Sequence, residues 1–136
     1  GGPGDGVDRG THTGRRGHAV TTITLIIKPL SVNDAWQGRR YSTGAKTAYE
    51  ATMRLLLPNR AIPGPYYRIE YDFHLVHFKT TDWDNLVKVT QDCLVKSGII
   101  TDDRHIVDAR VRKFPAKADH FVIRIEGCTL GLPVAP

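Results

Sequence analysis

The sequence predicts a single α/β domain of the α+β type, with a mixed β-sheet and two main helices in the order β-α-β-α-β-β. Three observations support this prediction. A length of 136 residues is typical of one domain. Apolar and polar residues alternate in several segments, which is strand periodicity, and apolar residues recur at helical spacing elsewhere. With 40% hydrophobic residues, the chain can bury a core without disulfide or metal staples.

The first half of the chain predicts one strand, one loop and one helix. Alternating side chains place the first strand from Val20 onward. A polar loop over residues 31–41 leads into a helix that ends at about Leu57. Ser42 or Thr43 is the expected N-cap of that helix, because a hydroxyl can accept the free backbone N–H groups of the first turn.

The second half predicts the centre of the domain. The longest strand spans Tyr66–Phe78 and has one apolar face. A helix over Asp82–Ser97 follows, with Gly98 as its C-cap and an apolar stripe toward the core. Two further strands are expected over His105–Phe114 and His120–Glu126. The strand face comprises Tyr67, Ile69, Tyr71, Phe73 and Leu75, and the helix stripe comprises Leu86, Val89, Cys93 and Leu94.

The ends of the chain differ in composition from this domain, which is expected over residues 20–127. Residues 1–19 are rich in glycine and indicate a disordered segment or an artificial extension. A basic DNA-contacting arm is the alternative for that segment, through Arg9, Arg15 and Arg16. Residues 128–136 are expected to be a frayed tail.

The overall charge favours an anionic partner. The formal net charge is +5, which is typical of small domains that bind nucleic acid. Cys93 and Cys128 lack the spacing of a zinc site. A chain with so few cysteines fits a reduced, cytoplasmic setting. No run of about 18 apolar residues is present, so no membrane span is expected.

The segment Thr81–Lys88 has the residues expected of a cation site. Asp82 and Asp84 flank the predicted start of a helix, where two carboxylates in an irregular turn can converge on one point. A site with only oxygen donors suits Mg²⁺, with Mn²⁺ as a substitute. One aspartate there is also explained as an N-cap, but two of them together with Asn85 exceed what a cap needs.

Two more charged positions complete the candidate set. Asp103 lies one helix and one turn further along, so the chain must double back to bring it beside Asp82. Otherwise Asp103 and Asp102 belong to a solvated acidic turn. Lys88 follows Asp84 by one helical turn and shares its face, either as a phosphate contact or as a surface ion-pair partner.

Several short motifs occur at spacings that resemble a known family. They are Asp82-Trp83-Asp84-Asn85-Leu86, Lys88, Lys96-Ser97-Gly98, Asp102-Asp103 and Val107-Asp108, with weaker similarity at Lys28–Asn33, Tyr41 and Tyr49. Together they resemble the RusA family of Holliday-junction resolvases. Two positions depart from the family member used for comparison. Phe78–Thr81 replaces an arginine run, and Asn33-Asp34 replaces paired asparagines.

The resemblance implies a homodimeric, Mg²⁺-dependent endonuclease that resolves four-way DNA junctions in recombination and repair, from a phage or bacterial source. By position it assigns Asp82, Asp84 and Asp103 as catalytic metal ligands and Lys88 as an essential lysine. Asn85 and Asp102 are secondary candidates. The alternatives are a nuclease specific for flaps or forks, and a non-catalytic protein that binds branched DNA.

Other basic and aromatic residues are candidate DNA contacts. Lysine and arginine side chains can track a phosphate backbone, and Trp36 or Trp83 can stack on an unpaired base unless it belongs to the core. A catalytic histidine is not expected, because the acidic set explains catalysis alone. The main phosphate contacts are expected from Lys79, Lys88, Arg104, Arg39 and Arg40, with Lys46, Arg110, Arg112 and Lys113 as further candidates.

Overall fold

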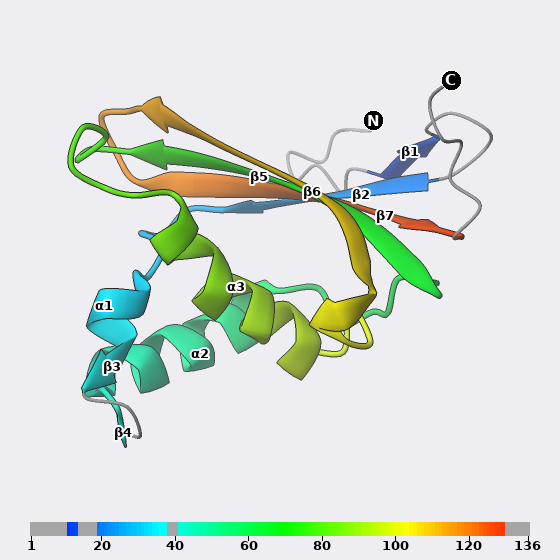
Figure 1. Ribbon diagram of the computed structural model, residues 1–136, viewed down its shortest axis with the longest axis horizontal. Coiled ribbons are helices and arrows are strands. Elements are labelled where there is room, and N and C mark those ends of the chain that lie inside the picture. The colour runs from blue at the N-terminus through cyan, green and yellow to red at the C-terminus, as the bar shows by residue number, and fades with distance from the viewer. Residues whose placement is uncertain (1–10, 14–18, 38–40, 130–136) are drawn as a thin grey trace.

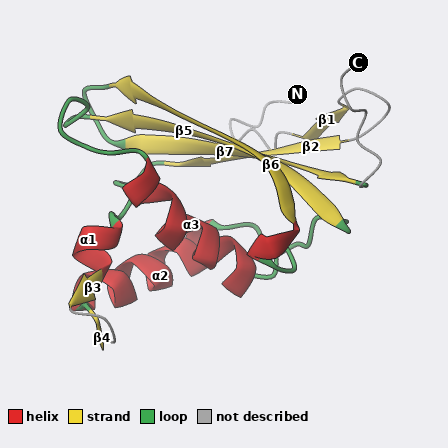
Figure 2. Cartoon of the chain, in the orientation of Figure 1, coloured by secondary structure: helices red, strands yellow, loops and turns green. Residues whose placement is uncertain are grey.

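The computed structural model describes residues 11–13, 19–37 and 41–129. A five-stranded mixed sheet forms one layer, and three helices lie against one of its faces (Figures 1 and 2). The predicted fold class is therefore confirmed. The strands in their order across the sheet are β1 (Thr11–Thr13), β2 (Ala19–Leu25), β7 (His120–Cys128), β5 (Tyr66–Leu75) and β6 (Ile106–Pro115).

The helices come from the connections between these strands. Two of them, α2 and α3, are the long helices expected from the sequence. None of the helices in the described ranges is long and apolar enough to cross a membrane. The remaining elements are α1 (Val32–Ala35), α2 (Gly44–Leu56), α3 (Asp84–Lys96), the 3-10 turn η2 (Asp103–His105) and a two-stranded ribbon of β3 (Trp36–Gln37) and β4 (Tyr41–Ser42).

β5 is an interior strand, between β7 and β6, and it supplies much of the core. Its predicted apolar face is fully buried beneath the helices, as the alternation of side chains required. β5 pairs antiparallel with β7 and parallel with β6. The strand ends at Leu75 rather than at Phe78, because the backbone turns there. The Val76 amide donates to the Asp119 carboxylate at 2.8 Å instead of to a strand neighbour.

α3 connects the two parallel strands. Its predicted apolar stripe is buried, and Gly98 ends the helix with a φ of 76°, a conformation that favours glycine. Ile99 and Ile100 continue the core, and the chain then returns toward the start of β6. The helix begins at Asp84 instead of Asp82, so the first aspartate belongs to the preceding turn.

Several predicted boundaries are wrong. The supposed loop over residues 31–41 contains α1, because the Ser31 hydroxyl accepts the Asn33 amide at 3.0 Å and caps a short helix. Within the segment expected to be disordered, Thr11–Thr13 pairs with β2. Cys128, placed in the frayed tail, pairs with Tyr66 as the last residue of β7. The other residues of that predicted tail lie outside the described range, apart from Thr129.

An ionic network occupies the sheet face opposite the helices. The buried Asp72 carboxylate accepts two hydrogen bonds from Arg112, at 2.8 and 2.9 Å, and one from Arg124 at 2.8 Å. Burial alone would raise the pKa of Asp72, but the hydrogen bonds from both arginines outweigh it and hold the pKa below its ordinary value. Asp72 thus ties β5 to both neighbouring strands through charged side chains.

Replacing Asp72 with Asn should destabilise the protein at neutral pH by roughly 1.5–3 kcal/mol, the range for hydrogen bonds to charged groups. Because the folded-state pKa is depressed, this stabilisation is present above the unfolded value of about 4 and is lost as the pH falls through the folded value. Urea unfolding at pH 7 and near pH 3 measures both effects. Glu70→Gln is the control, since the Glu70 carboxylate lies 3.8–4.0 Å from the arginines and makes no short hydrogen bond to them. Equal losses at both pH values would contradict this assignment.

Candidate functional site

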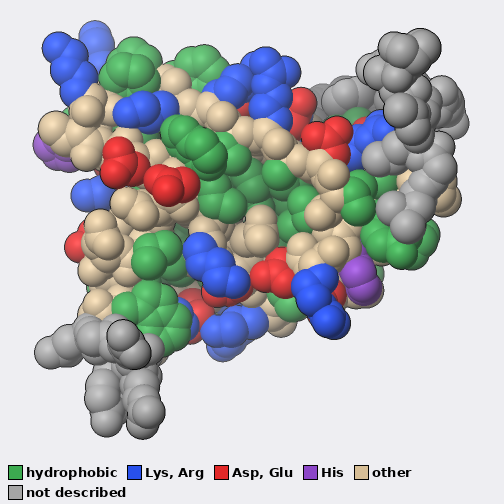
Figure 3. All heavy atoms as spheres, viewed as in Figure 1, with side chains coloured by type: hydrophobic (Ala, Val, Ile, Leu, Met, Phe, Trp, Pro, Cys, Tyr) green, Lys and Arg blue, Asp and Glu red, His purple; other side chains and the backbone are tan. Residues whose placement is uncertain are grey.

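The amino end of α3 presents two exposed carboxylates. Asp82 lies in the turn before the helix and Asp84 in its first position, and both are exposed. The N-cap residue is Trp83, and no side chain caps the helix. Capping therefore does not explain either aspartate. Figure 3 shows acidic side chains close together over this end of α3, with basic side chains around them.

Asp103 returns to the same helix, where it meets Lys88. It begins η2, and its carboxylate lies 3.4 Å from the Lys88 ammonium. The same ammonium lies 3.3 Å from the Asp92 carboxylate, one turn further along α3. Lys88 is thus shared between two carboxylates while its side chain remains 57% exposed, so a phosphate can reach it from solvent.

Asp92 was not predicted as a site residue. It was detectable, because it follows Lys88 at the i, i+4 spacing that joins residues on one helical face. Its hydrogen bond and charge raise the pKa of Lys88 above its ordinary value, and Asp103 adds a smaller effect in the same direction. The ammonium is therefore charged at neutral pH.

The three predicted metal ligands are near α3 but do not form one closed cluster. Within residues 11–13, 19–37 and 41–129, no three His, Cys, Asp or Glu side chains are close enough together to hold a metal ion. Asp103 is engaged by Lys88 instead. The donor chemistry nevertheless fits Mg²⁺ or Mn²⁺, since all three candidates are carboxylates at accessible positions. A cation that took Asp103 as a ligand would compete with Lys88.

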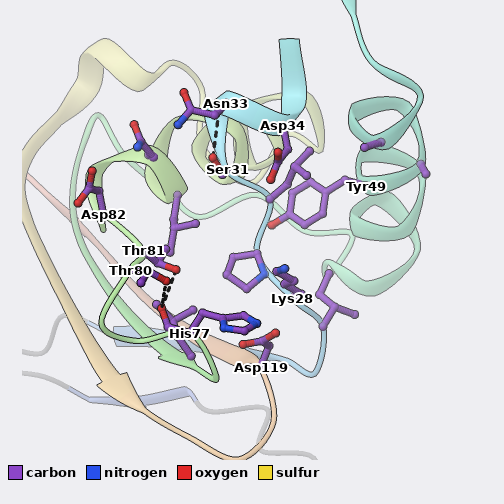
Figure 4. A pocket seen from close by; sticks show the side chains of 18 of the residues that line it. Lys28, Ser31, Asn33, Asp34, Tyr49, His77, Thr80, Thr81, Asp82 and Asp119 are labelled. Atoms are coloured by element: carbon purple, nitrogen blue, oxygen red, sulfur yellow. Dashed lines mark hydrogen bonds between the residues drawn. The ribbon is translucent and has the colours of Figure 1, made fainter. Parts of the chain in front are cut away.

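A groove of about 920 Å³ opens beside Asp82. Its walls are the segment after β2, the first turns of α2 and the turn between β5 and α3. Asn85 and Leu86 also line it, so the groove adjoins the amino end of α3. In Figure 4, Asp82, Asn33 and Asp34 lie toward one end, and Lys28, His77 and Asp119 toward the other.

The basic residues predicted to contact DNA differ in their exposure and in their ion-pair partners. Arg104 is 82% exposed and forms a two-point pair with Asp102, at 3.2 and 3.0 Å. That contact also holds the pKa of Asp102 well below its ordinary value. Lys79 is exposed in the turn after β5. Arg39 and Arg40 lie outside the described residues.

The two tryptophans are not core residues. Trp83 is 48% exposed beside the candidate site, and Trp36 is 38% exposed. The Lys46 ammonium lies 4.7 Å from the centre of the Trp36 ring, a cation–π distance. Both rings are therefore accessible for stacking.

Fold and site together define a small domain whose exposed carboxylates and lysine suit the cleavage of a phosphodiester. Comparison with protein families matches the family described as Endodeoxyribonuclease RusA over residues 34–126. The chain belongs to this family, whose members resolve Holliday junctions and bind branched DNA. The matched range contains Asp82, Asp84, Lys88 and Asp103, and it confirms the resemblance stated from the motifs.

Other comparisons add little. A search of curated proteins gives no match. One similar solved structure is described as "Crystal structure of HypE-HypF complex", at 17% identity and a TM-score of 0.35, covering 82% of this chain. This chain spans only 33% of that chain's length. A TM-score this low supports no conclusion about fold or function.

Replacing Asp92 with Asn should lower the pKa of Lys88, because it removes the stronger of its two carboxylate partners. Asp103→Asn should lower the same pKa by less. An NMR titration that follows the Lys88 Cε and Nζ signals measures both values, with Asp108→Asn, on β6, as the control. An unchanged pKa of Lys88 in Asp92→Asn would show that the ion pair on α3 is absent in solution.

Proposed function

We propose that this protein is a Mg²⁺-dependent endonuclease that resolves four-way DNA junctions by paired, symmetric nicks in recombination and repair. The observation that supports this most strongly is the family match, because the matched range includes every residue of the candidate acidic set. The return of Asp103 to α3 supports the same function. The net charge of +5 is consistent with an anionic substrate.

The three aspartates would hold the metal in this proposal. Asp82 and Asp84 would contribute their carboxylates from the amino end of α3, and Asp103 would contribute its carboxylate from η2. Bound Mg²⁺ would lower the pKa of a water molecule and relieve negative charge on the phosphate. The carboxylates also repel a phosphate when no cation is present, so metal and substrate are expected to bind together.

Lys88 would act on the substrate phosphate. Its ammonium is exposed, charged and held beside Asp103, so it can neutralise charge that builds on the phosphate during cleavage. Arg104 and Lys79 are proposed as contacts to the arms of the junction, together with Arg39 and Arg40. Such contacts position the DNA but do not read its sequence.

Asp82→Asn, Asp84→Asn and Asp103→Asn should each abolish cleavage while leaving junction binding near normal or tighter. Each change removes a metal ligand and also removes charge that repels the phosphate. Gel shifts in Ca²⁺ measure binding, and strand cleavage in Mg²⁺ measures activity. Glu70→Gln is the control, since Glu70 lies on β5 on the sheet face opposite the helices, away from α3 and η2.

Robust cutting by any of the three variants would exclude that residue as an essential ligand. Flap and fork substrates in the same assay separate the proposed junction resolvase from a nuclease of other specificity. Binding without cutting by the wild-type protein, on every substrate and in both Mg²⁺ and Mn²⁺, would instead indicate a non-catalytic branched-DNA-binding protein.

We further propose that the active unit is a homodimer. A four-way junction has two-fold symmetry, and its clean resolution needs two symmetric nicks. The described chain has one acidic site, so two sites require two chains, most simply related by a closed two-fold axis.

Mixing wild-type chains with Asp84→Asn chains should give dimers that nick one strand and fail to resolve the junction. A plasmid that contains a cruciform reports this directly, because a nick gives the open circle and paired cuts give the linear form. Sedimentation at micromolar concentration gives the mass of the bound species. A monomer that makes paired cuts on the junction would contradict the dimer.

A further inference from the structure

The turn between β5 and α3 determines where Asp82 lies. This turn spans Val76–Thr81 and is closed on itself by the His77 carbonyl. That carbonyl accepts the Thr81 hydroxyl at 2.8 Å and the Thr80 amide at 3.3 Å (Figure 4 shows the side-chain bonds). Thr81 directly precedes Asp82, so the conformation of the turn sets the direction in which the chain enters the acidic site.

Lys113 reaches this turn from the edge strand. It lies on β6 beside Phe73 of β5, and therefore shares the sheet face that the helices cover. Its ammonium donates to the Phe78 carbonyl at 2.6 Å and to the Thr81 carbonyl at 2.8 Å. The same ammonium lies 4.7 Å from the centre of the Phe78 ring. One side chain thus holds both ends of the four-residue segment that leads to Asp82.

This placement differs from the surface role that the sequence indicated. Lys113 belongs to a basic run on β6 and was expected to contact the DNA backbone. Instead its side chain is partly buried, and its ammonium hydrogen atoms point at two carbonyls of the protein. A charged donor forms a stronger hydrogen bond to a carbonyl than a neutral donor does. The two bonds from Lys113 therefore stabilise this conformation of the turn.

We propose that Lys113 is a positioning residue for the acidic site: it acts through the turn, and holds Asp82 and the amino end of α3 in the arrangement that cleavage needs. This inference rests on the proposed nuclease function. It differs from a DNA contact, whose loss would weaken junction binding and its salt dependence. It also differs from a purely structural role, whose loss would lower stability without a specific loss of rate.

The test compares Lys113→Met, which keeps the aliphatic stem, with Lys113→Arg, which keeps the charge and the donors. Lys117→Met is the control, because Lys117 is an exposed lysine just after the same strand. Single-turnover cleavage of a four-way junction in Mg²⁺ gives the rate, and gel shifts in Ca²⁺ give Kd. Amide NMR spectra of the metal-free protein report the conformation of residues 78–85.

The expected result for Lys113→Met is a single-turnover rate reduced roughly 10²-fold, the scale of a small misplacement at a reacting centre. Kd should change less than about threefold, and amide shifts should change mainly over residues 78–85. Lys113→Arg should recover most of the rate, and Lys117→Met should behave as wild type. If Lys113→Met does not fold, Lys113→Gln replaces it with the same expectations.

Three outcomes would overturn the proposal. They are an unchanged rate in a folded Lys113→Met protein, a loss that lies wholly in Kd, and amide changes spread over the sheet with none in the turn. The NMR measurement needs no substrate or metal. If the wild-type protein does not cut junctions, the proposed function fails, and the amide shifts still decide whether Lys113 holds the turn.

Discussion

The parallel pairing of β5 with β6 is the constraint on which the candidate site depends. Neighbouring strands that run in the same direction cannot be joined by a tight turn, so the chain must leave β5, pass along the sheet as α3 and return before β6 begins. That return brings Asp103 back to α3, where its carboxylate meets Lys88. The topology of the crossover therefore brings together Lys88 and Asp103, which most of α3 separates in the sequence.

Charge is distributed along α3 in a way that suits an anionic substrate. The positive partial charge at the amino end of a helix stabilises carboxylates there, and Asp84 occupies the first helical position. Lys88 lies one turn further and is balanced by Asp92 and Asp103. A phosphate at this face would meet a fixed ammonium beside carboxylates that need a cation, which is the combination that phosphodiester hydrolysis uses.

Local patterns in the sequence predicted β5, α3 and the Gly98 cap, because burial of one face follows from side-chain spacing alone. The four-residue α1 and three-residue β1 were not predicted, since such short elements show no period. Contacts between residues far apart in the sequence were not predicted, for another reason. The position of Asp103 beside Lys88 depends on the crossover, and the inward direction of Lys113 depends on strand pairing. The motifs indicated candidate residues for a site, but not which of them touch.

We propose that the carboxylates at the amino end of α3 and on η2 hold one catalytic cation. A crystal structure with Mn²⁺, located by its anomalous scattering, would show the ligands of that cation, since Mn²⁺ accepts the same oxygen ligands as Mg²⁺. We expect manganese bound by Asp82, Asp84 and Asp103, with Lys88 no longer paired to Asp103. Manganese bound only elsewhere, for example at the stacked His74 and His120 rings on the opposite face of the sheet, would contradict it.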